Sequence, residues 1–298
     1  MEIKGTIVED TYAEAFDGLF ARMIVTAKNS KLLKKAVYDA TALPCTVFGE
    51  AEGGVEAFLS PQETPDGRIG AIIQLWVAYT KNAKDKLTRE LGKRIRQGIL
   101  VVPTTRVFDA PMGEKKDEVS MMEIVGHCGD GHEWTEERFG RTLINVPLMM
   151  GEFLIDGKIT AQKGVAGGNI WLFCESEEDA LNAAEKCVLA TDKVPGAIAP
   201  FDICSAGSKV ETNFPEIGPT TNHPFCPTLK GKIADFKVPE GIVSIPEIVI
   251  DGTSLDAVRD AMKACVDAAA GMDGVRMISA GNFGGKLGRH HIYLKDLI

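Results

Sequence analysis

Two kinds of apolar pattern alternate along the chain. Short runs dense in Val, Ile, Leu and aromatic residues predict strands, whereas longer stretches with apolar residues three and four positions apart predict helices. The predicted strands comprise residues 20–27, 70–79, 169–175, 245–252 and 274–281. The predicted helices comprise residues 29–43, 82–98, 176–193 and 253–271. Strands and helices therefore follow one another, as in β-α-β units.

Polar residues mark where these helices begin and end. Asn29 or Ser30 is expected to cap the first helix, because a short polar side chain accepts a hydrogen bond from a free backbone N–H there. Ser176, followed by acidic residues, opens the third helix in the same way. Gly98 is expected to close the second helix.

Two stretches of the chain resemble each other. In "KKAVYDATALPCTVF" and "EKCVLATDKVPGAIA", a helix rich in Ala and Val ends before a proline and an apolar run follows. Lys35 and Lys186 are 151 residues apart, as are Pro44 and Pro195. The chain therefore reads as two copies of one unit.

Each copy contains two β-α-β units, with its helices expected on one face of a sheet. This split arrangement is called ferredoxin-like. We predict an α+β protein of two tandem ferredoxin-like lobes related by internal duplication, residues 1–148 and 149–298. The joint falls near 148–153, where nothing resembles a flexible linker, so the lobes are expected to pack tightly.

Composition narrows the class of protein. The 298 residues are 45% hydrophobic and 25% charged, which is typical of a soluble globular protein. A formal charge of -9 argues against a nucleic-acid partner, because phosphate binding needs clustered Lys and Arg. The start of the chain lacks the apolar core of a signal peptide, and the apolar window 143–155 is too short and too interrupted to span a membrane.

The seven cysteines form no C-x-x-C pair and stand mostly in apolar surroundings. They are expected to be reduced and buried as small apolar side chains. We therefore expect a cytoplasmic protein.

Two glycine-rich stretches flank predicted strands, "KGVAGGN" at 163–169 and "SAGNFGGKLG" at 279–288. The second contains a Gly-Lys pair, but Ala280 and Leu287 stand where a Walker loop needs Gly and Ser or Thr, so a nucleotide site is not expected. The backbone N–H groups of both loops could bind an anionic ligand. The alternative, that both loops are only tight turns, remains open.

Two further loops are rich in polar residues. "GHCGDGHEW" at 126–134 has His, Cys and Glu, but no matching ligands follow downstream, so no metal site is expected. "TTNHPFCPTLKG" at 220–231 is a long polar loop of the kind that forms ligand walls. No G-x-S-x-G elbow is present to indicate a serine nucleophile.

Glu247 is the sharpest single feature of the sequence. It stands in the strand "VSIPEIVID", directly after Pro246, and shares a face with Ile245 and Val249. If that face is buried, desolvation raises the pKa of the carboxyl, which suits a group that must hold a proton near neutral pH. If the face is an exposed sheet surface, Glu247 has no special role.

Several stretches together resemble one family, the formylmethanofuran–tetrahydromethanopterin N-formyltransferases. The resemblance spans almost the whole chain. The stretches that carry it are "EDTYAEAF", "VPTTRVFDA", "KGVAGGN", "TTNHPFCPTLKG", "IPEIVIDG" and "SAGNFGGKLG".

The resemblance implies an enzyme without a tightly bound cofactor. It would move a formyl group reversibly from formylmethanofuran to N5 of tetrahydromethanopterin, with both carriers acting as co-substrates. It also implies two ferredoxin-like lobes, a homodimer or homotetramer, and substrates bound in a cleft near a subunit interface.

The family's key carboxylate maps onto Glu247 in "IPEIVIDG", which gives this residue the role of catalytic acid and base. Backbone amides of 164–169 and 281–285 are expected to bind anionic groups of the substrates, and polar side chains to orient them. The residues expected to bind substrate are Asp109, Gly167, Gly168, Asn169, Ser208, Lys209, Asn222, Asn282, Gly284, Gly285 and Lys286.

Two alternatives remain beside the separate formyltransferase. The chain could be one subunit of a larger formyltransferase/hydrolase complex, as bacterial relatives suggest. It could also be a non-enzymatic ligand-binding dimer, since ferredoxin-like lobes also serve as small-molecule sensors.

Overall fold

The computed structural model describes residues 1–42, 51–113, 117–205 and 222–298. They form a mixed α and β fold with one large, mostly antiparallel sheet and few helices. The chain divides into two compact units, which we call the middle unit (residues 18–163) and the terminal unit (residues 1–17 and 164–298). No helix in the described part of the chain is long and apolar enough to cross a membrane.

The middle unit is built on four antiparallel strands in the order β6–β3–β5–β4, and β10, β9 and β8 continue the sheet beyond β6. Its strands are residues 18–26 of β3 (Tyr12–Thr26), β4 (Glu52–Leu59), β5 (Gly70–Ala78), β6 (Arg106–Asp109), β7 (Asp117–Ser120), β8 (Trp134–Arg138), β9 (Arg141–Leu148), β10 (Gly151–Asp156) and the first residues of β11 (Lys158–Cys174). Its helical segments are α1 (Ser30–Thr41), η1 (Pro61–Glu63), α2 (Ala83–Arg94), the π-helical η2 (Ile95–Leu100), α3 (Met121–Ile124) and η3 (Gly126–Gly129).

The terminal unit is built on four antiparallel strands in the order β14–β11–β13–β12, with β2 and β1 beyond β14. Its strands are β1 (Glu2–Ile3), β2 (Thr6–Val8), the start of β3, most of β11, β12 (Ala197–Ile198), β13 (Glu247–Gly252), β14 (Val275–Ser279) and β15 (His290–Tyr293). Its helical segments are α4 (Glu177–Thr191), η6 (His223–Phe225), η7 (Pro227–Leu229), α5 (Leu255–Ala269) and η8 (Leu294–Leu297).

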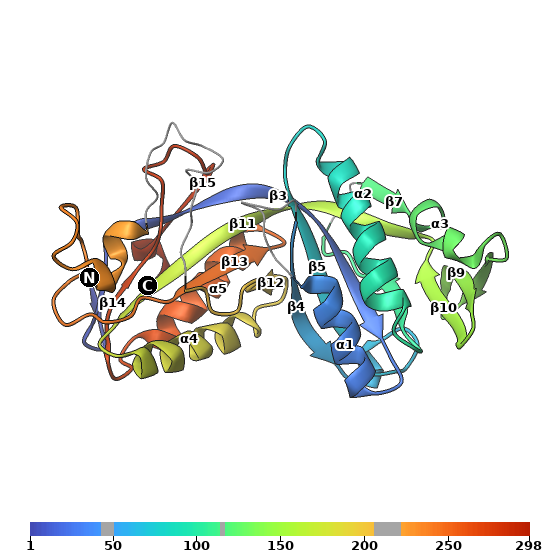
Figure 1. The fold of residues 1–298 in the computed structure, drawn as a ribbon, viewed down its shortest axis with the longest axis horizontal. Helices are drawn as coiled ribbons and strands as arrows, with labels where there is room; N and C mark the ends of the chain where they lie inside the picture. The colour runs from blue at the N-terminus through green and yellow to red at the C-terminus, as the bar shows by residue number, and fades with distance from the viewer. Residues whose placement is uncertain (43–50, 114–116, 206–221) are drawn as a thin grey trace. The chain divides into compact units, whose positions relative to one another are not determined.

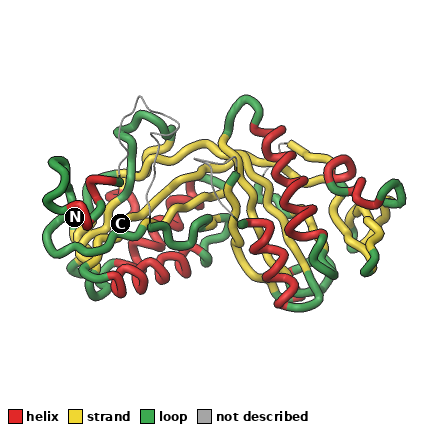
Figure 2. Tube along the Cα trace, viewed as in Figure 1, coloured by secondary structure: helices red, strands yellow, loops and turns green. Residues whose placement is uncertain are grey.

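The two units share one order of elements. Each runs strand, helix, strand, strand, helix, strand. When the four strands are numbered along the chain, they lie in the sheet in the order fourth, first, third, second in both units. In the terminal unit α4 and α5 lie side by side along one side of β11 and β13 (Figure 1). Figure 2 shows the corresponding pair of long helices, α1 and α2, against the strands of the middle unit.

Each unit has its own core between its helices and one face of its sheet. In the middle unit, Met23 and Leu75 are fully buried in this layer. In the terminal unit, Ile248 and Ile250 of β13 are fully buried with Val258 of α5. Side chains alternate along a strand, so those of Glu247 and Val249 point to the opposite face of the sheet.

Helix starts follow the polar signals in the sequence. Asn29 caps α1, with its side chain accepting a hydrogen bond from the N–H of Leu32. Ser176 caps α4 by accepting from the N–H of Asp179. The predicted end at Gly98 is wrong, because α2 continues directly into η2 and Gly98 lies inside that segment. A glycine is required there by the close approach of α1, since a Cβ would lie 2.8 Å from the backbone N of Ala40.

The boundary expected between residues 148 and 149 falls at the tip of the β9–β10 hairpin, where Leu148 pairs with Gly151. The compact units divide instead after residues 17 and 163. The reason is that the first residues of the chain hydrogen-bond to strands near its end: β2 pairs with β14, and β15 pairs with the start of β3.

A buried carboxylate fixes the glycine-rich loop 281–288. Glu14, on β3, is 1% exposed and accepts hydrogen bonds from the backbone N–H groups of Phe283 and Gly285 at 2.8 Å, and of Leu287 and Gly288 at 2.6 Å. Burial acts to raise the pKa of Glu14, but the four hydrogen bonds to its charged form outweigh burial and lower that pKa. The anion that this loop binds is therefore a side chain of the same chain.

Gly98→Ala is expected to lower the free energy of unfolding by ~2 kcal/mol or more, because the backbone of Ala40 cannot move aside as a flexible side chain would. Chemical denaturation measures the change. Gly92→Ala, on the adjoining helix, is the matched control: its Cβ would lie 3.5 Å from the Cβ of Ile124, an ordinary contact. That control should be neutral or up to ~1 kcal/mol more stable, since Ala favours a helix. Equal losses in both variants would contradict this account.

Glu14→Gln is expected to lower the free energy of unfolding by ~2 kcal/mol at neutral pH, because an amide cannot replace a carboxylate that accepts four N–H donors. The contribution of a carboxylate with a lowered pKa is present above its unfolded pKa of about 4.3 and is lost as the pH falls through the folded pKa. Denaturant unfolding from neutral to acidic pH should therefore show the two proteins converging in acid. The exposed Glu2→Gln serves as control, and a gap that widens in acid would refute the assignment.

Candidate active site

Glu247 is buried on the face of the terminal sheet that α4 and α5 do not cover. It is the first residue of β13, and only 3% of it is exposed. Trp171, Phe173, Val238 and Ile242 form a separate apolar cluster that lines this face. The alternative of an exposed sheet surface is therefore excluded for Glu247.

A row of residues crosses the sheet at the level of Glu247. On one side Glu247 pairs with Trp171 of β11, which in turn pairs with Ser279 of β14. On the other side Glu247 and Cys204 exchange backbone hydrogen bonds of 2.8 and 2.9 Å. Side chains of directly paired residues lie next to each other on one face. We call Ser279, Trp171, Glu247 and Cys204 the cross-strand row.

Hydrogen bonds from this row reach the carboxyl group of Glu247. The indole Nε1 of Trp171 donates to Oε1 of Glu247 at 2.8 Å, and the side chain of Cys204 hydrogen-bonds to the same carboxyl group. Burial raises the pKa of Glu247, while both hydrogen bonds lower it in part, and the pKa remains above its ordinary value. Such a carboxyl group holds its proton to higher pH than an exposed glutamate and can donate it to a reacting oxygen or nitrogen.

Aromatic rings cover the row. Phe225 of η6 meets the Trp171 ring edge-on with centroids 5.0 Å apart, and meets Phe173 at 6.1 Å. Asn222 is half-buried immediately before η6. The polar loop that the sequence indicated as a ligand wall therefore begins close to the aromatic cover of Glu247, as far as its described residues show.

Asn169 ties the glycine-rich loop to the row. Its Oδ1 accepts from the N–H of Gly281 at 2.6 Å, and its Nδ2 donates to the carbonyl of Gly281 at 3.1 Å. A Cβ on Gly281 would lie 2.7 Å from the ring of Trp171, so only glycine fits there. Asn169 thus positions the start of the loop against the indole that contacts Glu247.

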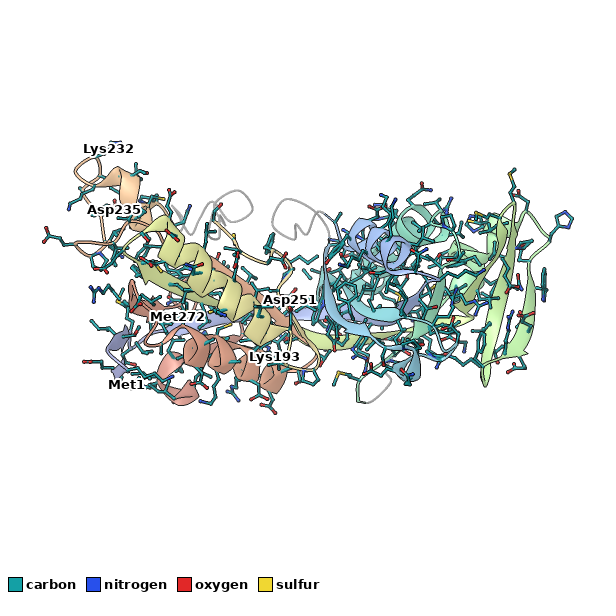
Figure 3. All side chains as sticks on the ribbon, turned by 90° about the horizontal axis from the view of Figure 1, so that it is seen from below. Met1, Lys193, Lys232, Asp235, Asp251 and Met272 are labelled. Carbon is teal, nitrogen blue, oxygen red and sulfur yellow. The ribbon has the colours of Figure 1, made fainter. Side chains whose placement is uncertain are left out.

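The glycines of β11 have packing roles. The N–H of Gly167 donates to Asp251 Oδ1 at 2.9 Å, and Asp251 is labelled in Figure 3. A Cβ on Gly168 would lie 2.3 Å from Val258 of α5. Asp251 of the same chain thus accepts the hydrogen bond of the Gly167 amide, and the expected contact of Gly167 with a substrate stays a prediction.

The backbone N–H groups at the tip of loop 281–288 also donate to groups of the same chain. The N–H of Gly285 donates to Glu14, and that of Gly284 donates to Asn282 Oδ1 at 3.1 Å. Asn282 Nδ2 in turn donates to the carbonyl of Tyr12 at 3.2 Å. Both amides thus donate within the chain, and Lys286 beside them is exposed; the expected substrate contacts of these residues stay predictions.

Asp109 lies in the middle unit, where it has a structural role. Its carboxylate accepts from Thr160 N at 2.9 Å and Thr160 Oγ1 at 2.6 Å, and its own N–H donates to Asp156. Asp109 belongs to the middle unit and Glu247 to the terminal unit, and the expected contact of Asp109 with a substrate stays a prediction. Ser208 and Lys209 lie outside the described residues.

Trp171, Cys204 and Glu14 were missed from the sequence as parts of the site. Trp171 stands in a predicted strand, where an aromatic residue is ordinary, and Cys204 is one of seven cysteines without spacing. Glu14 precedes the predicted strand 20–27, and no pattern in the sequence marked it. Among the described residues, no group of three or more His, Cys, Asp and Glu side chains is placed to hold a metal ion.

Comparisons with known proteins agree over the whole chain. Residues 1–148 match the family model described as formylmethanofuran-tetrahydromethanopterin formyltransferase, and residues 151–297 match the model of its proximal lobe. A formyltransferase-like protein of Archaeoglobus fulgidus is 62% identical, over 100% of this chain and 98% of that protein.

Two solved structures have the same fold. The formylmethanofuran:tetrahydromethanopterin formyltransferase of Methanosarcina barkeri has a TM-score of 0.92 at 37% identity and 100% coverage of both chains. A chain of the formyltransferase/hydrolase complex of Methylorubrum extorquens, solved with methylofuran, has a TM-score of 0.89 at 35% identity, covering 100% of this chain and 98% of that one. The chain belongs to the formylmethanofuran-tetrahydromethanopterin formyltransferase family.

Proposed function

We propose that this protein transfers a formyl group reversibly between formylmethanofuran and N5 of tetrahydromethanopterin, with Glu247 as its acid and base. The observation that carries the proposal is a buried carboxyl group with a raised pKa, held by an indole N–H, in a member of this family. No metal or tightly bound cofactor is part of the proposal.

The chemistry needs one group that both gives and takes a proton. N5 of the pterin attacks the formyl carbon, a new C–N bond forms, and the carbonyl oxygen becomes an oxyanion. Protonated Glu247 gives its proton to that oxygen and, now a carboxylate, takes the proton released by N5. Glu247 then passes that proton to the departing amine nitrogen as the old C–N bond breaks, and it recovers its original proton from the hydroxyl group as the C=O bond forms again.

The shared order of elements supports the proposal that the chain arose by duplication of a ferredoxin-like unit. In both units the strand order is fourth, first, third, second, with two helices on one face, as that fold requires. The repeat in the sequence aligns α1 with α4. The lobes predicted at 1–148 and 149–298 describe this duplication along the sequence. The compact units differ from these lobes because the start of β3 belongs to the terminal unit and the start of β11 belongs to the middle unit.

Two polar residues are proposed to contact the substrates. Lys286 would bind an anionic group of a substrate, and Asn222 would orient the formyl or pterin group. We retain Ser208 and Lys209 as substrate-binding residues by resemblance to the family. A homodimer or homotetramer in the cytoplasm is proposed on the same ground.

A second candidate is favoured by one comparison. The chain superposes on a subunit of a formyltransferase/hydrolase complex with full coverage, so it could work within a similar assembly. The chemistry at Glu247 would be the same in both cases.

Glu247→Gln is expected to lower turnover by ~10²-fold or more while substrate binding changes little, because the amide keeps the shape but cannot transfer the proton. An absorbance assay with formylmethanofuran and tetrahydromethanopterin follows formation of the 5-formyl pterin. Glu240→Gln, an exposed position in the turn before β13, should leave turnover unchanged. Near-normal turnover in Glu247→Gln would reject the assignment, and tight binding without any turnover in the native protein would favour a ligand-binding dimer.

The same variant reports on folding. A carboxyl group with a raised pKa contributes stability below its unfolded pKa of about 4.3 that is lost as the pH rises through the folded pKa. Glu247→Gln has no charge to bury, so its Tm should equal or exceed that of the native protein, with a difference that grows as the pH rises. A lower Tm at every pH would mean that lost turnover reflects damage to the fold.

Gel filtration of a native extract separates the two candidates. A separate formyltransferase should elute as a homo-oligomer, and the purified chain alone should form the 5-formyl pterin. Elution together with other polypeptides, combined with no transfer by the purified chain alone, would establish the complex instead.

A further inference from the structure

We propose that Trp171 and Cys204 are positioning residues for Glu247, which hold its carboxyl group from both sides so that the catalytic proton sits on Oε2. This inference deepens the proposed function and rests on it. It starts from the cross-strand row, in which β11 on one side of Glu247 and the segment after β12 on the other each contribute one side chain to the same carboxyl group.

The donor chemistry of Trp171 decides which oxygen carries the proton. An indole N–H donates and cannot accept, so the oxygen at 2.8 Å from Trp171 Nε1, Oε1, must act as an acceptor. If Oε1 carried the proton, it would be a poorer acceptor for the N–H of Trp171. The proton of the neutral acid therefore lies on Oε2, on the side of the carboxyl group away from the indole.

Cys204 complements this fixed donor. A thiol is both a weak donor and a weak acceptor, so it can remain hydrogen-bonded to Glu247 in either ionisation state. Its backbone exchanges two hydrogen bonds with Glu247, which fixes the pair in register. The carboxyl group can then change its charge during the reaction without changing its rotamer.

The surroundings leave Trp171 little freedom to move. Its strand is paired on both sides, Gly281 packs on the ring closely enough to exclude a Cβ, and Phe225 meets it edge-on. A donor fixed in this way loses little energy in reorganisation when charge develops on its partner.

Other charged groups on neighbouring elements stay the same in every variant. Glu9 hydrogen-bonds to Ser279 at the far end of the row. His223 of η6 pairs with Asp235 at 2.8 Å, and Lys237, on the same later segment as Asp235, lies over the ring of Phe225 at 5.8 Å. Any difference in titration between variants therefore reports on the two donors.

The test compares Trp171→Phe, Cys204→Ala and Cys204→Ser with the native protein. The first reading is the carboxyl C=O band of Glu247 in infrared spectra against pH, without substrate, isolated by subtracting the spectrum of Glu247→Gln. Removing a donor that favours the carboxylate should move this titration to higher pH in Trp171→Phe and Cys204→Ala. Cys204→Ser keeps a donor and should titrate near the native protein.

The second reading is kcat against pH. Loss of either donor should lower the maximal kcat by ~10-fold, since hydrogen bonds to a charged group contribute on that scale. The basic limb of the profile should move to higher pH at the same time, and KM should change little. General damage lowers kcat without moving the limb.

Two matched variants control for the size of the substitution. Trp76→Phe removes another buried indole N–H, which donates to Gln74 at 2.8 Å in the middle unit. Cys128→Ala removes a half-buried thiol in that unit. Both should leave the Glu247 titration and the kcat profile unchanged.

The outcomes separate this inference from the proposed function. An unchanged infrared titration in both Trp171→Phe and Cys204→Ala overturns the positioning role, even if kcat falls. Absence of formyl transfer by the native protein overturns the proposed function, while the infrared titration still decides whether these two residues set the protonation of Glu247.

Discussion

The burial of one carboxyl group against an indole N–H constrains the rest of the terminal unit. A carboxyl group removed from water needs partners for its oxygens, or its burial becomes too costly to maintain. Here the partners come from β11 on one side of β13 and from the segment after β12 on the other, and both must be in register with Glu247. The indole also needs a glycine beside it at position 281 and an aromatic ring at 225. Pairing across the sheet therefore sets the surroundings of the carboxyl group, and the residues at 281 and 225 pack against the indole.

Two buried glutamates in the same unit have opposite pKa shifts. Glu14 is 1% exposed and Glu247 is 3% exposed, so burial penalises the charged form of both. Four backbone N–H groups surround Glu14 and overcome that penalty, whereas the side chains of Trp171 and Cys204 offset it only in part at Glu247. The number and kind of donors therefore make one carboxyl group a fixed anion and leave the other able to hold a proton.

Backbone N–H groups of the glycine-rich loops, which could bind an external anion, donate to carboxylates of the same chain. The amides of loop 281–288 point at a carboxylate, as a nest of backbone N–H groups would, but the carboxylate is Glu14 of the same chain. At Gly167 the carboxylate is Asp251. In both loops these backbone N–H groups are therefore hydrogen-bonded within the chain.

The sequence by itself determined the local structure. Helices α1, α4 and α5 follow from their caps and periodicity, β13 from its run of Ile and Val, and the repeated order of elements from the spacing of similar stretches. Glu247 stood out because a carboxylate in such a strand demands an explanation. These signals are local, since capping and alternation act over a few residues.

Only the tertiary structure decided what surrounds Glu247. Trp171 is 76 residues away in sequence, and nothing in its own strand predicts that it faces a carboxyl group. Strands β3 and β11 extend well before their predicted starts, because the start of β3 pairs with β15 and the start of β11 pairs with β7. Gly98 has the sequence signature of a helix end, but it is a glycine because the backbone of α1 packs against it. Pairing across a sheet depends on residues far apart in sequence, and a single strand does not specify its neighbours.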